Sequence, residues 1–492
     1  MPQVNIKKRD VSFVVRLNFQ LHYETFFCIA LSCHGCLSLR IMPTMRFRAL
    51  PGLARLQCLL LLGLCYSSVA FSGYRTFLDP RSMAMGGTGV ASSTKFNASS
   101  HNPALIAFNR GNKPDKIHIS ASLGTRELHN YSLEDDIRNF QNSDLTDDFA
   151  EAIQEAGKDD DAALIEKVRT TGQNLKKALQ DINLSSYRED ETSAFSLLVD
   201  TDPVTINFFT RREIRQMITI LDTDVNIISK TIDHFEDPDN VDLPGGNIEE
   251  RVEPRVDSTY FEIKEFGATV ATTNVYDYNM PISWGFTPKI IEMNGSHISN
   301  KISDYDVANP AEERISTGLL EWNLDIGFAM LLTDDFLEQE LGLDGFWLEG
   351  EWVFGMSGMN LFPTDFTPFG AGQANPELPA NKRAIQALYQ LGLAHYRENF
   401  MVTMDIELSE HEVFDFEGLT RFLSIGGEYY WRDDLHIRAG IRINTVQTEG
   451  AGQDTDTLSA GFLYQPHGFS IEAAVMGNDV EFGGTLGFGL TF

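Results

Sequence analysis

The sequence predicts a mainly β protein, a transmembrane antiparallel β-barrel of about 14 strands with a helical insert. Three observations predict this fold. Apolar residues alternate with small or polar residues in many segments after residue 115, and the connections between these segments alternate between short and long. The chain also ends on an aromatic residue that belongs to such a segment. A period of two is the pattern of a strand with one apolar face.

The first 70 residues carry a secretion signal. In residues 45–70, arginines precede an apolar run from Cys58 to Cys65, and the small-x-small triplet Ser68-Val69-Ala70 follows. This order is typical of a signal peptide, which normally stands at the N-terminus. We therefore interpret residues 1–44 as an over-called N-terminal extension and expect the mature chain to begin near Phe71.

The expected mature chain is acidic and has no cysteine, because all five cysteines lie at or before Cys65. Residues 1–70 hold eight basic and two acidic residues, so their removal leaves 31 basic and 68 acidic residues, a net charge of −37. Nucleic acid is then not expected as a partner, since phosphate contacts require a basic patch. Asp237, Asp239 and Asp242 lack the spacing of a calcium loop, and solvated loop charge is the favoured interpretation.

Fourteen segments with strand alternation follow. In one of them Leu435 and Ile437 point one way, while Arg438 and Arg442 point the other. Charged side chains are costly against lipid, so we expect these arginines to face a water-filled lumen. The same holds for Asp405 and Glu407 of another segment. Ten residues at ~3.3 Å rise and a tilt near 45° span roughly 23 Å, close to an outer-membrane apolar band. The segments are residues 115–123, 192–200, 204–213, 259–274, 279–294, 315–333, 346–357, 384–397, 399–409, 419–431, 434–446, 455–464, 468–476 and 482–492.

The connections favour a membrane barrel over a soluble sandwich, whose strands would also alternate. Every second connection is only a few residues long, apart from residues 334–345, and the opposite set includes long loops such as 124–191 and 214–258. Short turns on one rim and long loops on the other are typical of outer-membrane barrels, with the short turns periplasmic.

The last segment is expected to close the barrel by pairing with the first, which leaves no backbone edge exposed in hydrocarbon. Its closing-strand signature is the apolar face Leu486, Phe488, Leu490 and Phe492.

In the insert, at about residues 125–190, apolar residues recur at helical spacing instead of alternating. Ser132 and Asp135 form a capping-box pattern, and a second apolar stripe runs from Leu164 to Ile182. We expect a helical hairpin that packs over the barrel mouth, outside the cell.

The segment before the first strand resembles a known family. Its small-residue run "AMGGTGVA", followed by Asn102, Pro103 and Ala104 in "NPALIAF", is similar to the front of FadL-type outer-membrane proteins. In that superfamily the segment folds as a hatch inside a fourteen-stranded barrel. The resemblance implies an N-terminal hatch at residues 71–114 and a barrel at residues 115–492.

Within that superfamily the long first insert, "ISWGFTPKI" (282–290), "LHIRAGIR" (435–442) and the ending "GGTLGFGLTF" most resemble the plasmid-transfer TraF-like proteins. The resemblance covers residues 71–492. It implies a bacterial outer-membrane location and a non-enzymatic role in conjugative transfer or surface assembly. The implied partners are outer-membrane lipid, the barrel-assembly machinery and other transfer-apparatus proteins.

Two alternatives stay open at this point. One is a FadL-like diffusion channel for a hydrophobic ligand, with the hatch as gate, although no matching pocket residues are apparent. The other is a barrel enzyme, although no nucleophile is paired with a base at an interpretable spacing. We expect no catalytic residues, no cofactor and no metal site. A loop expected outside the cell carries Leu361, Phe362, Phe366 and Phe369, which either bind a ligand or partner or pack on the barrel rim.

Overall fold

The structure is a computed structural model that divides the chain into two compact units. One unit comprises Met1–Val69 with Glu338–Gly342, and the other Ala70–Leu337 with Leu343–Phe492. In the first unit β1 (Phe13–Leu17) and β2 (Phe27–Leu31) form an antiparallel ribbon. The structure describes residues 13–17, 27–31, 79–108, 117–129, 133–158, 161–183, 187–201, 204–220, 222–237, 255–275, 280–302, 317–339, 342, 345, 349–366, 383–410, 419–446 and 456–492.

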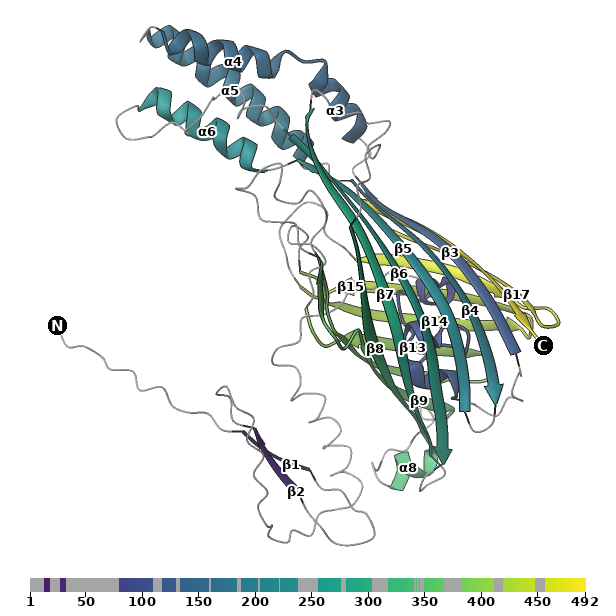
Figure 1. Ribbon diagram of the computed structural model, residues 1–492. Helices are drawn as coiled ribbons and strands as arrows, with labels where there is room; N and C mark the ends of the chain where they lie inside the picture. The colour runs from purple at the N-terminus through teal and green to yellow at the C-terminus, as the bar shows by residue number, and fades with distance from the viewer. Residues whose placement is uncertain are drawn as a thin grey trace. The chain divides into compact units, whose positions relative to one another are not determined.

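The second unit contains a closed antiparallel barrel of 14 strands, which confirms the predicted fold class (Figure 1). The last strand pairs with the first, and the remaining neighbours pair in chain order, so the sheet has no open edge. The strands are β3 (Ile117–His129), β4 (Tyr187–Thr201), β5 (Val204–Ile220), β6 (Arg255–Val275), β7 (Pro281–Lys301), β8 (Thr317–Leu332), β9 (Glu351–Met359), β12 (Leu388–Tyr396), β13 (Phe400–Glu407), β14 (Phe422–Arg432), β15 (Leu435–Asn444), β16 (Thr457–Tyr464), β17 (Phe469–Gly477) and β18 (Glu481–Thr491).

Three short elements lie in the connections between barrel strands. β10 (Thr364–Phe366) and β11 (Arg383–Ile385) form a separate pair between β9 and β12. A short helix, α8 (Asp334–Gln339), follows β8. Among the described residues no helix is long and apolar enough to cross a membrane.

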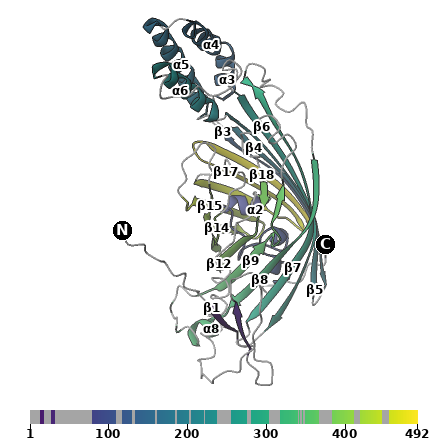
Figure 2. The same ribbon diagram turned by 60° about the vertical axis from the view of Figure 1, so that its left-hand side comes forward.

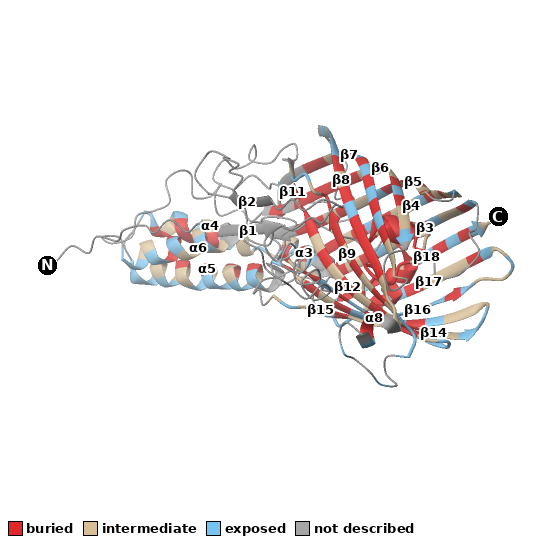
Figure 3. Ribbon diagram, turned by 90° about the horizontal axis from the view of Figure 1, so that it is seen from below, coloured by how far each residue is buried: buried red, intermediate tan, exposed pale blue. Residues whose placement is uncertain are grey.

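The strands bury one face and expose the other, as the striped pattern in Figure 3 shows. Along β18 the side chains of Leu486, Phe488 and Leu490 are exposed on the outer face, while Gly487 and Gly489 between them are buried. Phe492, 71% exposed, donates its backbone N–H to the carbonyl of Ile117 on β3 at 3.0 Å. Exposed apolar side chains around a closed barrel form the surface that lipid requires.

The strands differ greatly in length. β6 and β7 have 21 residues each, whereas β13 and β16 have 8. At ~3.3 Å per residue the long strands run about 70 Å, far more than a tilted crossing of the apolar band needs. β3 to β7 therefore continue beyond the segments predicted for them, and the added residues are mostly polar, such as Glu189 on β4 and Gln216 on β5.

The helical insert is larger than the predicted hairpin. The connection from β3 to β4 contains three helices, α3 (Leu133–Gln141), α4 (Leu145–Ala156) and α5 (Ala162–Asn183). A fourth, α6 (Asp222–Glu236), comes from the connection between β5 and β6 and lies beside them (Figure 1). Ser132 of the predicted capping box lies outside the described residues.

The four helices and the ends of the long strands share one apolar core. Phe149, Val168 and Leu175 lie in this core together with Ile218 of β5 and Val256 of β6. The side-chain amide of Gln141 also donates to the carbonyl of Ile302 at 2.6 Å. We call α3 to α6 the helical bundle. Because its core includes strand residues, the bundle is a packed extension of the barrel wall.

A hatch occupies the barrel lumen. It contains α2 (Pro80–Ala84) and the 3-10 helices η1 (Ala98–Ser100) and η2 (Pro103–Ile106). α2 packs on β15 to β18, while η2 packs on β5 to β8. These strands lie on opposite sides of the closed sheet, so the hatch crosses the lumen, as Figure 2 shows.

Inward-facing glycines make room for the hatch along one side of the wall. A Cβ at Gly426 would lie 2.5 Å from the Cβ of Met85, and one at Gly392 would lie 2.8 Å from the Cβ of Val90. Carbon atoms do not approach this closely, so only glycine fits. We call the set the glycine wall; its members, each facing a hatch residue, are Gly285, Gly327, Gly355, Gly392, Gly426, Gly440 and Gly461 on β7, β8, β9, β12, β14, β15 and β16.

Valine at Gly426 is expected to push the hatch away from β14. Such overpacking costs about 1–3 kcal/mol, so the temperature at which the barrel loses its compact electrophoretic mobility in detergent should fall. The neighbouring Gly427→Val is the matched control, because Gly427 points away from the hatch and its Cβ would lie 3.5 Å from the nearest atom, the Met401 carbonyl oxygen. Equal transition temperatures for the two variants would contradict the glycine wall.

Gly172 is expected to hold the helical bundle together, because a Cβ there would lie 2.7 Å from Phe149 of α4 and 2.8 Å from Ile232 of α6. Gly172→Leu should separate the three helices, at a cost of about 1–3 kcal/mol, and speed limited trypsin cleavage within α5 while the barrel stays intact. Asn174→Leu, at an exposed position of the same helix, serves as control. Unchanged cleavage of Gly172→Leu would contradict this role.

Candidate functional site

Asn102 links the hatch to the barrel wall. Its side-chain nitrogen donates to the carbonyl of Val90 at 2.8 Å and to that of Phe328 on β8 at 2.9 Å. Its side-chain oxygen accepts from the backbone N–H of Ala104 at 3.1 Å and so caps η2, whose first residue is Pro103. The Asn102-Pro103-Ala104 motif is buried, and both N–H donors and the oxygen of the Asn102 amide serve to position the hatch.

Arg81 of α2 makes a two-pronged ionic contact between hatch and wall. Its guanidinium donates to both carboxylate oxygens of Glu428 on β14, at 2.9 and 2.7 Å. Glu428 also accepts from Arg438 of β15 at 2.8 Å, and Arg438 contacts Glu472 of β17. Burial lowers the pKa of Arg81, but the charge of Glu428, its hydrogen bond to Arg81 and the nearby Tyr396 and Tyr430 together raise that pKa. Removal of Glu428 would leave the buried charge of Arg81 without this carboxylate, which is strongly destabilising.

Asp405 of β13 anchors the glycine-rich stretch of the hatch. Its carboxylate accepts from the backbone N–H groups of Gly89 at 2.6 Å and Val90 at 2.8 Å. Inside the hatch, Asp79 plays a similar role, because it accepts from the backbone N–H of Ser82 at 2.8 Å and pairs with His101 at 2.7 Å. Charged acceptors strengthen such backbone hydrogen bonds.

A second ionic cluster holds the other end of the hatch. Lys289 of β7 lies 2.8 Å from Glu265 and 3.0 Å from Asp325, and Arg211 of β5 lies 3.0 Å from Glu265. Arg211 also donates to the backbone carbonyl of Ser99 in η1 at 2.6 Å. The hatch is thus fixed to the wall by charged side chains on β5, β13 and β14.

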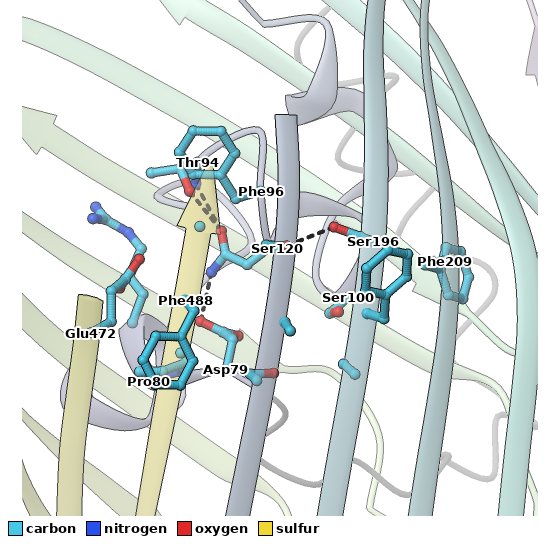
Figure 4. Close-up of a pocket in the computed structure, with 18 of the residues that line it drawn as sticks. Asp79, Pro80, Thr94, Phe96, Ser100, Ser120, Ser196, Phe209, Glu472 and Phe488 are labelled. Atoms are coloured by element: carbon cyan, nitrogen blue, oxygen red, sulfur yellow. Dashed lines mark hydrogen bonds between the residues drawn. The ribbon is translucent and has the colours of Figure 1, made fainter. Parts of the chain in front are cut away.

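A cavity of about 70 Å³ remains between the hatch and the strands β17, β18, β3, β4 and β5. Figure 4 shows Asp79, Thr94 and Phe96 of the hatch on one side of it, and Ser120 and Ser196 of the wall on the other. The two serine hydroxyls hydrogen-bond at 2.7 Å. The cavity is much smaller than the pocket that a drug-sized ligand needs, which is about 300–1,000 Å³.

The other predicted site residues do not meet at this cavity. Of the predicted aromatic loop, Phe362 is exposed and lies 4.6 Å from the ring of Trp322 on the outer face of β8, and Leu361 is half-buried. The side chain of Phe366 and all of Phe369 lie outside the described residues. In the closing-strand signature Phe488 touches the cavity wall, while the whole set faces outward.

Two residues that anchor the hatch, directly or through Glu428, had a signal in the sequence. Asp405 and Arg438 stand at inward positions of alternating strands, which predicted a polar lumen but gave no partners. Arg81 and Glu428 had no signal, because their pairing joins residues 347 positions apart.

Comparisons with known proteins bear on this arrangement. Residues 100–337 match the family described as "F plasmid transfer operon, TraF, protein". No curated protein matches the chain.

The structure is similar to solved outer-membrane proteins. A mutant of the TodX monoaromatic hydrocarbon channel is 12% identical, with 85% of this chain and 99% of that chain covered and a TM-score of 0.45. The P. putida toluene transporter TodX is 12% identical, with 86% and 99% covered and a TM-score of 0.42. A Pseudomonas aeruginosa FadL homologue is 12% identical, with 86% and 99% covered and a TM-score of 0.40.

The TraF match begins in the hatch at Ser100 and ends in α8 at Leu337, so it contains the helical bundle and the strands β3 to β8. A closed 14-stranded barrel with an apolar outer face places the protein in the bacterial outer membrane. The sequence predicted a TraF resemblance over residues 71–492, and the family match covers residues 100–337 of these. The protein is therefore an outer-membrane β-barrel that matches the TraF family of the F plasmid transfer operon.

Proposed function

We propose that this protein is a non-enzymatic outer-membrane component of conjugative transfer or surface assembly, and that its helical bundle binds other transfer-apparatus proteins. The observation that carries this proposal is the position of the TraF match, which covers the bundle and the strands that hold it. A bundle with its own apolar core, packed on strand ends, is a rigid platform. Rigid elements present a binding surface at low entropic cost.

The hatch contacts fit a role that requires a closed lumen. The hydrogen bond from Arg211 of β5 to the Ser99 carbonyl, the ion pair of Arg81 with Glu428 of β14 and the glycine wall hold the hatch in place. The barrel is therefore occupied rather than an open pore. The FadL-like alternative, a diffusion channel for a hydrophobic ligand, would use the same hatch as its moving part. The two functions therefore depend on different regions, the bundle for transfer and the hatch for diffusion.

The helical bundle is expected to face the cell exterior. If the hatch enters from the periplasm, β3 crosses once, and the even strand number returns the C-terminus to the periplasm. Trypsin added to intact cells should then cleave after exposed basic residues such as Lys158 and Lys177. Cleavage that appears only after the outer membrane is permeabilised would place the bundle in the periplasm.

Plasmid transfer frequency is expected to fall at least tenfold when Gly172→Leu replaces the wild-type protein, since the bundle loses its helix packing at a cost of about 1–3 kcal/mol. Asn174→Leu should transfer normally, and Gly426→Val, which shifts the hatch, should affect transfer less than Gly172→Leu. The measurement is mating efficiency of a deletion strain that expresses each variant at equal outer-membrane level.

The same strains separate the two functions. If Gly172→Leu transfers like the wild type, the bundle is not the functional element. If Gly426→Val instead alters growth on a hydrophobic carbon source while Gly427→Val does not, the diffusion channel is supported in its place.

A further inference from the structure

The lipid-facing surface of the barrel has a groove of about 710 Å³ over the strands β17, β18, β3, β4 and β5. Apolar side chains at outward positions line most of it, and Val475, Phe482 and Leu486 among them are each more than half exposed. The volume lies within the range of about 300–1,000 Å³ that is typical of ligand pockets. We call this hollow the outer groove; it lies on the opposite face of the wall from the hatch.

A glycine leaves the space at the apolar end of the outer groove. Gly484 of β18 stands between Val475 of β17 and Thr125 of β3 in the paired strands. A Cβ at Gly484 would lie 3.7 Å from its nearest atom, a backbone oxygen, which is an ordinary contact. At Gly487 of the same strand, in contrast, a Cβ would lie only 2.9 Å from Pro80 of the hatch. Packing within the wall therefore requires glycine at position 487 but not at position 484.

The other end of the outer groove is polar. Glu191 and Ser193 of β4 and Arg212 of β5 line it, and all three stand at outward positions of their strands. Charged side chains on the lipid face of a barrel are costly at the middle of the membrane and tolerated near its surface. The polar end therefore lies at the level of lipid headgroups, and the apolar end at β17 and β18 lies against acyl chains.

Arg212 has donor capacity to spare at this polar end. Its Nε donates to Glu262 at 2.6 Å, and Lys264 lies 2.9 Å from the same carboxylate, so Glu262 already meets two cations. Its two Nη atoms have no hydrogen-bond partner among the residues that the structure describes, and its side chain is 49% exposed. A guanidinium fork of this kind matches the oxygens of a phosphate group.

The groups around Arg212 suit a headgroup that also carries hydroxyl or amide groups. Thr125 of β3 pairs with Glu191 of β4, and Ser193 stands on the same outward face. Their hydroxyl and carboxylate oxygens can accept hydrogen bonds from sugar hydroxyls and amide N–H groups. At about 4.8 Å per strand, β18 and β5 lie roughly 14 Å apart, so one amphiphile can reach both ends of the outer groove.

We propose that the outer groove binds lipid A, the phosphorylated and acylated glucosamine lipid of the outer leaflet. An acyl chain lies over Gly484, Arg212 binds a phosphate, and Glu191 binds sugar hydroxyl or amide groups. The choice of leaflet rests on the outward orientation proposed for the helical bundle, because Ile218, six residues after Arg212 on β5, lies in the core of that bundle. The lipid site is otherwise independent of the transfer role proposed for the bundle.

Native mass spectrometry of the full barrel tests the site. Wild-type protein, washed free of lipid in detergent, is titrated with lipid A and separately with phosphatidylethanolamine. We expect lipid A to bind about tenfold more tightly, because phosphatidylethanolamine has no sugar. This readout does not depend on plasmid transfer, so its failure leaves the function proposed for the bundle unaffected.

Gly484→Leu fills the apolar end and should weaken lipid A binding about tenfold. Gly427→Leu is the matched control, because Gly427 is a glycine of β14, outside the outer groove, whose Cβ would likewise have an ordinary contact, at 3.5 Å. Both variants should keep the compact electrophoretic mobility of the folded barrel, which shows that a change in binding is not a loss of fold.

Arg212→Gln should weaken lipid A binding about fivefold but leave the binding of dephosphorylated lipid A unchanged. Lys264→Gln is its control, because Lys264 contacts the same carboxylate of Glu262 but does not line the outer groove. It should bind lipid A like the wild type.

Three results would overturn the proposal. Phosphatidylethanolamine that binds as tightly as lipid A would show that the outer groove does not recognise the sugar headgroup. Equal binding by Gly484→Leu and Gly427→Leu would show that no acyl chain lies over Gly484. Equal losses in Arg212→Gln and Lys264→Gln would show a general attraction of charge without a phosphate site at Arg212.

Discussion

Backbone hydrogen bonding in hydrocarbon is the constraint on which this structure depends. A peptide group that faces lipid without a partner costs several kcal/mol, so a sheet in a membrane must close on itself. Here closure is made by β18 and β3, whose register runs from Glu481 opposite Leu128 to Thr491 opposite His118. Once the sheet is closed, inward and outward side chains are separated along every strand. The apolar surface for lipid and the polar surface for the hatch both follow from that separation.

The hatch is held by two kinds of contact that act differently. The glycine wall provides shape, because main-chain atoms around Met85 and Val90 reach the strand backbone itself. The buried ion pairs fix the position along the wall, because Arg81 meets a buried carboxylate at Glu428. With the glycine wall alone, the hatch could slide along the wall. With the ion pairs alone, it could lie farther from the wall. Together they define one position.

The sequence predicted the barrel well and its surroundings less well. Alternation identifies each of the 14 strands because lipid on one side and a polar lumen on the other act on every residue in the membrane. The signal fades where β4 to β7 leave the apolar band, since polar residues such as Glu189 on the outer face and Asp190 on the inner face then stand on both sides of the sheet. The sequence did not predict α6. Its apolar face packs on helices from another connection, so that face could not be assigned a partner from the sequence of α6 itself. The hatch position came from a family resemblance, and neither the Arg81–Glu428 pair nor the fit of Gly426 to Met85 can be obtained from spacing along one chain.

The closing pair of strands has a consequence for the order of folding. His118 and Thr491 are hydrogen-bonded although 373 positions separate them, and the hatch precedes β3 in the chain. The barrel therefore cannot close until the C-terminal strand has been delivered, and contacts between such distant residues form slowly. A hatch that spans the lumen and contacts strands from β5 to β18 is most readily enclosed as the sheet curls around it. In that order of events the hatch is the inner surface on which the last strands pack, since α2 contacts β15 to β18.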